Sequence, residues 1–325
     1  MVDKLFKNCY DGVKIRTCSV RQAPDGSKAN GWRMPAADWR DVCMKRKIVL
    51  DSSSNLWQLP GVDYACVPLK IITDEQEYVD EPGTDAFAMA HALRAYKGKS
   101  STSCPNVGDF LAAYAGADEI FVVTITGTLS GCNNAARMAA EEYQDTNPGA
   151  KVFVLDSLST GPEMCLLARR LAALAPTEAT FEEICDAVTA YAEHTHLLFS
   201  LESLNNLARN GRVKLTAAVV ARALGIRVLG QASPQGELDI ICKTRGEHGV
   251  LERTILEMRD RGFANGKVQI AHCDNEKAAR RLKLMIEAIW PDSEVEIVEC
   301  GALCSFYAEL GGLLVGYEDA AAPTI

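Results

Sequence analysis

Four consecutive hydroxyl side chains in the stretch KSSTSCPNVGDF, residues 99–110, are the first candidates for ligand chemistry. They are Ser100, Ser101, Thr102 and Ser103. Serine and threonine clusters are typical of loops, and Pro105 argues against a helix through this stretch. Uncharged hydroxyls can donate hydrogen bonds to an anion. The stretch is therefore predicted to be a loop, which either lies on the surface or holds the head group of a ligand.

Three further segments rich in hydroxyls and glycine each follow a predicted strand. They are DSSSN at residues 51–55, TGTLSGCNN at residues 126–134 and DSLSTG at residues 156–161. In an open parallel sheet, ligands bind beyond the carboxyl ends of the strands, where loops and helix N-termini converge. All three segments are therefore expected along one edge of the sheet, at the ligand site.

Ser130 is the strongest single candidate in these segments. It lies between Gly127 and Gly131, just before a predicted helix whose first N–H groups attract an anion. The simpler interpretation is that Ser130 caps this helix. A nucleophilic role has no positive support, because the run Gly-Thr-Leu-Ser-Gly departs from the Gly-x-Ser-x-Gly elbow and no histidine is tied to Ser130 by sequence. No catalytic residue is predicted.

A short predicted helix, LNNLARNGRVK at residues 204–214, carries basic residues at its end, among them Arg212 and Lys214. Basic side chains at a helix C-terminus commonly interact with the helix dipole. If this segment faces the hydroxyl-rich segments, Arg212 would instead reach a ligand head group. Lys243 and Arg245 are weaker candidates for the same role, because they are expected on a solvated strand edge.

The elements that position these residues follow two patterns along the chain. Residues 47–194 alternate short apolar strands with helices, which indicates a parallel sheet covered on both faces. Residues 195–325 hold six candidate strands, two of them joined only by SPQG, which forces an antiparallel pair. The predicted fold is α/β with two domains, a parallel α/β/α domain and a mixed six-stranded domain, with the ligand between them.

Two helices in this scheme carry local signals. TFEE at residues 180–183 is a capping box that begins a helix. The stretch NEKAARRLKLMIEAIW, residues 275–290, has apolar residues at helical spacing, and these are expected to form its buried face. They are Ala278, Leu282, Met285 and Ile289.

The first 46 residues differ from the rest of the chain. They hold ten Lys/Arg against five Asp/Glu, whereas the other 279 residues hold 24 against 38. They also lack a helical or strand period, so an irregular basic extension is predicted, with Met44 as the hypothetical natural start.

Composition excludes several classes of function. The net charge of −9 argues against nucleic acid as a partner. The chain has no apolar run long enough to span a bilayer and no secretory signal, so a cytoplasmic protein is expected. The twelve cysteines are interpreted as reduced thiols, and Cys300 and Cys304 have no second ligand pair after them, so neither a metal nor another cofactor is predicted.

A set of motifs in fixed order resembles the DegV family of bacterial lipid-binding proteins, over nearly the whole stretch from Met44 to about Glu318. The motifs are IVLDSSSNL, VPLKI followed by YVD, STSCPNVGDF, TGTLSGCNNAA, VLDSLSTG, LNNLARNGRV and the hairpin leading to ICKTRG. The resemblance implies a non-catalytic protein that holds one long-chain fatty acid, such as hexadecanoate, between its two halves. It also implies a partner, a separate ATP-dependent fatty-acid kinase that phosphorylates the bound carboxylate.

The same resemblance assigns the carboxylate to two residues. Thr102 matches the threonine of the family's Thr-Ser-x-Pro motif, and Ser130 matches the serine of its Ser-Gly motif. Ser103, Arg212 and Tyr307 are the candidate neighbours of the head group, and Ser101 is also expected close by.

The chain departs from the family pattern near the head group. Tyr307 stands where histidine is usual, Cys104 where glutamine is common, and Cys132 where threonine is common. Tyrosine can donate a hydrogen bond but cannot carry a positive charge near neutral pH. Two alternatives to a fatty-acid carrier therefore stay open, a sensor of a small polar ligand and a hydrolase or acyl transferase that uses Ser130. The first predicts a small polar cavity, and the second predicts a base beside Ser130.

Overall fold

The structure is a computed structural model, and it describes residues 44–213 and 225–324. Residues Met44–Ile325 form one compact unit. The predicted extension lies outside the described residues except at its end, where Arg46 is already the first residue of strand β1. The hypothesis that Met44 is the natural start also concerns residues outside the described part.

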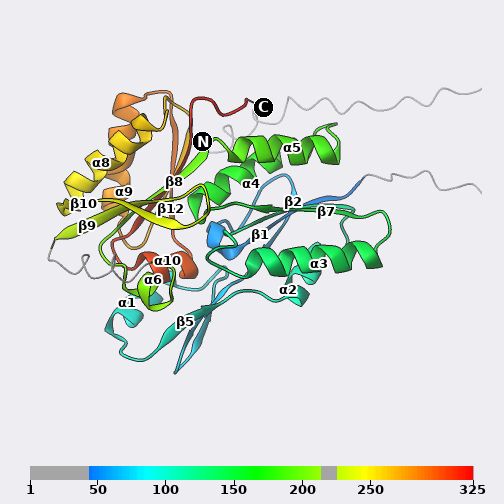
Figure 1. Cartoon of the computed structure of the whole chain (residues 1–325), viewed down its shortest axis with the longest axis horizontal. Coiled ribbons are helices and arrows are strands. Elements are labelled where there is room, and N and C mark those ends of the chain that lie inside the picture. The colour runs from blue at the N-terminus through cyan, green and yellow to red at the C-terminus, as the bar shows by residue number, and fades with distance from the viewer. Residues whose placement is uncertain (1–43, 214–224, 325) are drawn as a thin grey trace, which may run out of the picture. The chain divides into compact units, whose positions relative to one another are not determined.

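The first sheet has four parallel strands in the order β2-β1-β6-β7 (Figure 1). The strands are β1 (Arg46–Asp51), β2 (Asp63–Val67), β6 (Glu119–Thr124) and β7 (Lys151–Asp156). Their residues are mostly apolar, and β6 is buried along its whole length. A strand that is buried along its whole length needs cover on both faces, so the sheet requires helices on each side.

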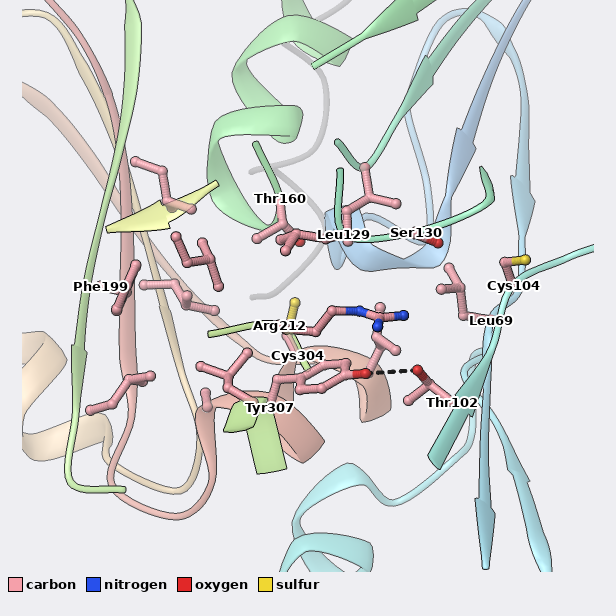
Figure 2. Close-up of a pocket in the computed structure, with 18 of the residues that line it drawn as sticks. Leu69, Thr102, Cys104, Leu129, Ser130, Thr160, Phe199, Arg212, Cys304 and Tyr307 are labelled. Atoms are coloured by element: carbon pink, nitrogen blue, oxygen red, sulfur yellow. Dashed lines mark hydrogen bonds between the residues drawn. The ribbon is translucent and has the colours of Figure 1, made fainter. Parts of the chain in front are cut away.

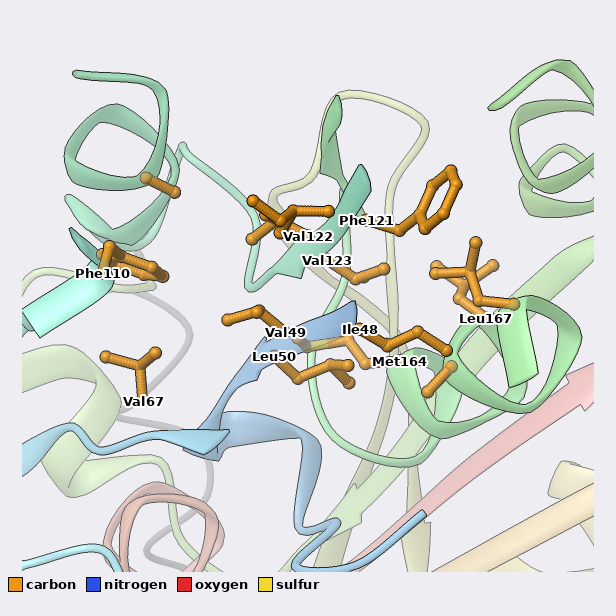
Figure 3. Packing of buried hydrophobic residues seen from close by; sticks show 14 of the residues in the cluster. Ile48, Val49, Leu50, Val67, Phe110, Phe121, Val122, Val123, Met164 and Leu167 are labelled. Atoms are coloured by element: carbon orange, nitrogen blue, oxygen red, sulfur yellow. The ribbon is translucent and has the colours of Figure 1, made fainter. Parts of the chain in front are cut away.

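Four helices provide this cover. They are α2 (Val107–Tyr114), α3 (Cys132–Thr146), α4 (Pro162–Leu174) and α5 (Phe181–Ala192). Figure 3 shows Phe110 of α2 on one side of β1 and β6, with Met164 and Leu167 of α4 on the other side. The predicted parallel α/β/α arrangement is confirmed.

The second sheet has six strands in the order β10-β9-β8-β13-β11-β12. They are β8 (Thr195–Leu201), β9 (Ile226–Ala232), β10 (Leu238–Arg245), β11 (Lys267–His272), β12 (Glu294–Glu299) and β13 (Leu313–Glu318). All pairs are antiparallel except β11 with β12, and β9 with β10 forms the predicted hairpin. Helices α8 (Gly246–Asp260) and α9 (Glu276–Ile289) pack on this sheet. The predicted mixed six-stranded half is confirmed.

A small third sheet corrects the prediction for the hydroxyl cluster. Ser100–Ser103 is not a loop but strand β5, which pairs antiparallel with β3 (Lys70–Thr73), and β4 (Glu77–Val79) pairs with the other edge of β3. Serine disfavours strands through local hydrogen bonding, but backbone pairing with a distant strand overrides that preference. Pro68 has no N–H, and the apolar run around it divides there into β2 and β3.

The helix signals were right in one case and partly wrong in the other. Thr180 caps α5, since its side chain accepts from the N–H of Glu183 and the Glu183 side chain reaches back. In α9, Ala278 and Leu282 are buried as predicted, but Ile289 is 54% exposed. The buried row continues to Ile286, because positions four apart keep the same face of a helix.

Helix α4 connects the two large sheets. It contacts β1 and β6 of the parallel sheet and β8, β11 and β13 of the mixed sheet. Gly316 of β13 permits this close approach, because a Cβ there would lie 2.5 Å from the backbone nitrogen of Glu163. The Glu163 side chain is buried at this junction and accepts hydrogen bonds from Ser159 and Thr195. A domain boundary at residues 194–195 stays a prediction.

Three smaller helical elements complete the part that surrounds the site. They are α1 (Ala86–Ala95), α6 (Asn205–Arg209) and α10 (Ala302–Ala308), and a single 3-10 turn, η1 (Ser52–Ser54), follows β1. Across residues 44–213 and 225–324, no helix is both long enough and apolar enough to cross a membrane.

The buried carboxyl of Glu163 makes stability depend on pH in a defined direction. Burial raises its pKa from 4.5 to about 7, so the folded protein keeps a proton that the unfolded chain has already lost. The free energy of unfolding should therefore fall as pH rises from about 4.5 to about 7. The decrease contributed by Glu163 amounts to on the order of 3 kcal/mol. In Glu163→Gln the side chain cannot ionise, so this part of the decrease in the free energy of unfolding should be absent.

Urea unfolding of both proteins in mildly acidic and mildly alkaline buffer measures this difference. Burial also raises the pKa of Asp51 and of Asp80 to about 6, with the same sign, but these groups are common to both proteins and cancel in the comparison. An identical pH dependence in the wild type and the variant would contradict the assignment to Glu163.

Candidate functional site

The candidate site is a cavity of about 300 Å³ between the carboxyl edge of the parallel sheet and one face of the mixed sheet. Figure 2 shows its two ends, with Thr102, Cys104 and Ser130 on one side and Phe199 on the opposite side. Hydroxyls gather at the first end and leucines at the second. The lining includes Thr102, Ser103, Ser130, Arg212 and Tyr307, which are the five residues predicted for the head group of a ligand.

Thr102 and Tyr307 meet directly at the polar end. Their hydroxyl oxygens lie 2.7 Å apart, although the residues are 205 positions apart in the chain. Strand β5 presents Thr102, and α10 presents Tyr307. Ser101, on the same strand, is exposed and does not line the cavity, so its predicted place beside the head group is wrong. Adjacent strand residues point to opposite faces, which separates Ser101 from Thr102.

Buried acceptors fix the position of Tyr307. The N–H of Gly301 donates to Asn55 Oδ1 at 2.8 Å, and the N–H of Ala302 donates to Asp80 Oδ1 at 2.5 Å, so the start of α10 is capped from the parallel-sheet side. Burial raises the pKa of Tyr307, although its bond to Thr102 and the nearby Arg212 charge oppose this. The phenol therefore stays protonated near neutral pH and can donate a hydrogen bond.

Ser130 lies one residue before the N-cap of α3, which is Gly131. The capping interpretation was therefore wrong in position, although Ser130 Oγ still accepts from the N–H of Cys132 at 3.3 Å. The Ser130 hydroxyl donates to Cys132 Sγ at 3.1 Å. Sulfur is a weak acceptor, so the hydroxyl can turn to a better one in the cavity at little cost.

The three hydroxyl-rich segments differ in what they contribute. Residues 126–134 supply Leu129, Ser130 and Gly131 to the lining, and residues 156–161 supply Thr160. Residues 51–55 do not line the cavity, because the three serines of η1 are buried and their hydroxyls hydrogen-bond to Asp51 and to the N–H of Leu69.

Asp51 explains why the η1 turn faces inward. Its carboxylate accepts from the N–H and Oγ of Ser53 and from the N–H of Ile125 at 2.6 Å. The thiol of Cys132 is also within its hydrogen-bonding reach. Asp51 therefore connects β1, the end of β6 and the start of α3, and this segment supports the site without lining it.

Arg212 lines the cavity together with Ser130. Its segment therefore faces a hydroxyl-rich segment, which was the condition for its predicted contact with a ligand head group. Its Nη1 donates to the carbonyl of Asn210 at 2.8 Å, and Figure 2 shows the side chain extended toward Ser130 and Tyr307. Lys243 and Arg245 are exposed on β10 and do not line the cavity. Lys214 lies outside the described residues.

The apolar end was not identified from the sequence. Leu197, Phe199 and Leu201 of β8 line the cavity, and Leu238 of β10 and Leu314 of β13 join them. In HLLFSL, positions 197, 199 and 201 are apolar, whereas His196 and Ser200 on the other face are polar. This period of two marks an apolar face, but it does not tell a face that lines a cavity from one that packs in a core. Cys304 also lines the cavity without any signal in the sequence, whereas Cys104 lines it within the STSCPNVGDF motif.

Ser130 has no general base beside it among the described residues. Its Oγ bonds only within residues 130–132, and no histidine of residues 44–213 or 225–324 lines the cavity. His91 pairs with Asp274, and His194 and His196 both pair with Asp319. In the same part of the chain, no cluster of His, Cys, Asp or Glu has the geometry to hold a metal ion.

Comparisons with known proteins agree on one family. The family model for DegV, described as an uncharacterised protein of the DegV family, matches residues 45–319. A DegV domain-containing protein of Streptococcus pneumoniae is 40% identical over 255 residues, which covers 78% of this chain and 91% of that protein.

Two solved structures are similar over most of the chain. A DegV family protein from Eubacterium eligens, loaded with heptadecanoic acid, is 40% identical with a TM-score of 0.83, covering 84% of this chain and 99% of that one. The Fatty Acid Kinase (Fak) B3 protein of Streptococcus pneumoniae, loaded with linoleic acid, is 39% identical with a TM-score of 0.83, covering 85% and 99%.

The bond between Tyr307 and Thr102 can be tested by a double-mutant cycle. Tyr307→Phe keeps the ring and removes the hydroxyl, so the free energy of unfolding should fall by about 1 kcal/mol. Thr102→Val should cost a similar amount, and the double variant should cost no more than either single variant. Urea unfolding measures all three. Fully additive effects would mean that the two hydroxyls do not interact in solution.

Proposed function

This chain belongs to the DegV family, and we propose that it binds one long-chain fatty acid in the cavity between its two large sheets. The carboxylate lies at the end formed by Thr102 and Ser130, and the tail lies against β8. One observation carries the proposal, namely that a single cavity joins a hydroxyl cluster to a wall of leucines. The solved relatives loaded with heptadecanoic and linoleic acid support it.

The tail supplies most of the affinity. A sixteen-carbon chain buries about fourteen methylenes at ~0.8 kcal/mol each, a gross driving force on the order of 10 kcal/mol. Each hydroxyl bonded to the carboxylate adds roughly 1.5 to 3 kcal/mol. The two ends therefore have different roles: the tail gives affinity, and the hydroxyls fix which way the molecule lies.

The hydroxyls of the polar end can form a hydrogen-bonded network around the carboxylate. The Thr102 and Tyr307 hydroxyls share one hydrogen bond in which either can donate. With Tyr307 as the donor, the Thr102 proton is free to point at the ligand. Ser130 turns from Cys132 to the second carboxylate oxygen, because an anionic oxygen is a far better acceptor than a thiol. Arg212 supplies the positive charge at this end. Tyr307 thus takes over the donor role at the family's histidine position without adding a charge that changes with pH.

The polar end is also reachable from outside, which supports presentation of the carboxylate to a partner. Ser130, Gly131 and Arg212 line a second, more open groove as well as the cavity. We propose that the chain acts in the cytoplasm as the non-catalytic subunit of a fatty-acid kinase. The similarity to the Fak B3 protein supports this partner.

A small polar ligand fits the cavity less well. Leu197, Leu201, Leu238 and Leu314 offer no hydrogen bonds to polar groups buried against them. An unpaired buried polar group costs about 1–3 kcal/mol. The apolar wall therefore favours a hydrocarbon tail.

Mass spectrometry of the purified full chain tests the fatty acid directly. Under native conditions, a mass excess should appear that vanishes on denaturation and matches a fatty acid in an organic extract. Ser130→Ala should weaken retention by roughly tenfold to a hundredfold, since one charge-assisted hydrogen bond is lost. Ser101→Ala is the matched control, because Ser101 shares the hydroxyl cluster but does not line the cavity. Equal retention in both variants would refute the role of Ser130, and no binding of any fatty acid would refute the function.

The kinase partner is tested separately. Loaded protein, mixed with ATP and the catalytic subunit of a bacterial fatty-acid kinase, should yield an acyl phosphate. Loaded Ser130→Ala should give less product at equal occupancy, because the carboxylate is held in fewer productive orientations. Stable fatty-acid binding without any acyl phosphate, with kinases from several bacteria, would limit the protein to a carrier.

A further inference from the structure

One row of side chains on β8 forms the apolar wall. Leu197, Phe199 and Leu201 lie two residues apart and all line the cavity, as expected for one face of a strand. Leu198 lies between them and packs instead into the core under α8 and α9. Within residues 44–213 and 225–324, the aromatic residues of the lining are Phe199 and Tyr307. Figure 2 places Phe199 opposite Thr102 and Ser130.

The Phe199 ring lies in a place that its neighbours leave empty. In the sheet, Phe199 pairs with Gly230 of β9 on one side and with Leu314 of β13 on the other. Directly paired residues share a face, so Gly230 leaves a gap beside Phe199 on the cavity side. A Cβ on Gly230 would lie 2.2 Å from the tip of the Phe199 ring, so the ring fills that gap. It leans across β9 rather than standing out from the sheet as side chains usually do.

This arrangement makes the ring a stiff part of the wall. Strand β8 is internal to the sheet, between β9 and β13, so the backbone beneath the ring is bonded on both sides. Phe199 is 1% exposed, and its rigid planar ring is packed over Gly230, so a change of rotamer would displace packed atoms.

We propose that the Phe199 ring, seated over Gly230, is the stop for the methyl end of the bound fatty acid and sets the longest tail that the cavity accepts. The inference rests on the proposed function and adds the residue that selects tail length. Affinity should rise about fourfold for each methylene added, until the tail reaches the ring. Beyond that length, each further carbon should give no gain, because it must displace packed atoms.

Competition among a homologous series of saturated fatty acids for the delipidated full chain, read by native mass spectrometry, locates this limit. Phe199→Ala opens the wall and should move the limit to tails longer by about two carbons or more, with Phe199→Leu moving it less. Phe199→Trp should move it to shorter tails. Gly230 is not substituted, because a Cβ there would also lie 2.6 Å from the carbonyl oxygen of Asp239.

Leu69→Ala is the matched control. Leu69 lines the cavity beside Cys104 at the polar end, so its truncation should weaken all fatty acids without moving the limit. Variants that bind fatty acids with an unmoved limit would overturn the inference and leave the proposed function intact. A wild-type protein that binds no member of the series would overturn both.

Discussion

The cavity depends on the contact between α4 and β13. Gly316 lets the first turn of α4 lie directly on the mixed sheet, with no room for a Cβ between them. The same helix packs on β1 and β6, so the carboxyl edge of the parallel sheet is held opposite the face formed by β8 and β13. Ser130 and Thr160, which follow the parallel strands β6 and β7, then lie in the same cavity as leucines of the antiparallel strands. Neither sheet alone would provide both a polar end and an apolar wall.

Buried carboxyl groups that do not line the cavity stabilise the segments around it. Asp51 accepts from Ser53 and Ile125, Asp80 caps α10, and Glu163 accepts from Thr195 across the α4 junction. Burial raises the pKa of each of these carboxyls. A proton or several hydrogen bonds are needed to keep such groups in an apolar interior, which accounts for the serines that surround them.

The head-group end combines mostly neutral donors with one cation. Tyr307 keeps its proton near neutral pH. The Ser130 hydroxyl donates to a thiol sulfur, which is a weak acceptor, so this hydrogen bond is exchanged for a better one at little cost. Tyr307 supplies a hydroxyl where the family pattern has histidine, and Cys132 is the acceptor for Ser130 where the pattern has threonine.

The sequence by itself determined the alternation of strands and helices around the parallel sheet, the six strands of the mixed sheet, the hairpin between β9 and β10, and the cap of α5. Periodicity, turns and caps are local signals. It also predicted Thr102, Ser130 and Arg212 as head-group residues, and all three line the cavity, while their contact with a ligand stays a prediction. Only the tertiary structure decided that Ser100–Ser103 is a strand, that the η1 serines face inward, and that Phe199 faces the cavity. Each of these features depends on a partner distant in the chain. Strand β5 pairs with β3, and Asp51, which holds the η1 turn, accepts from the N–H of Ile125. The Phe199 ring lies over Gly230.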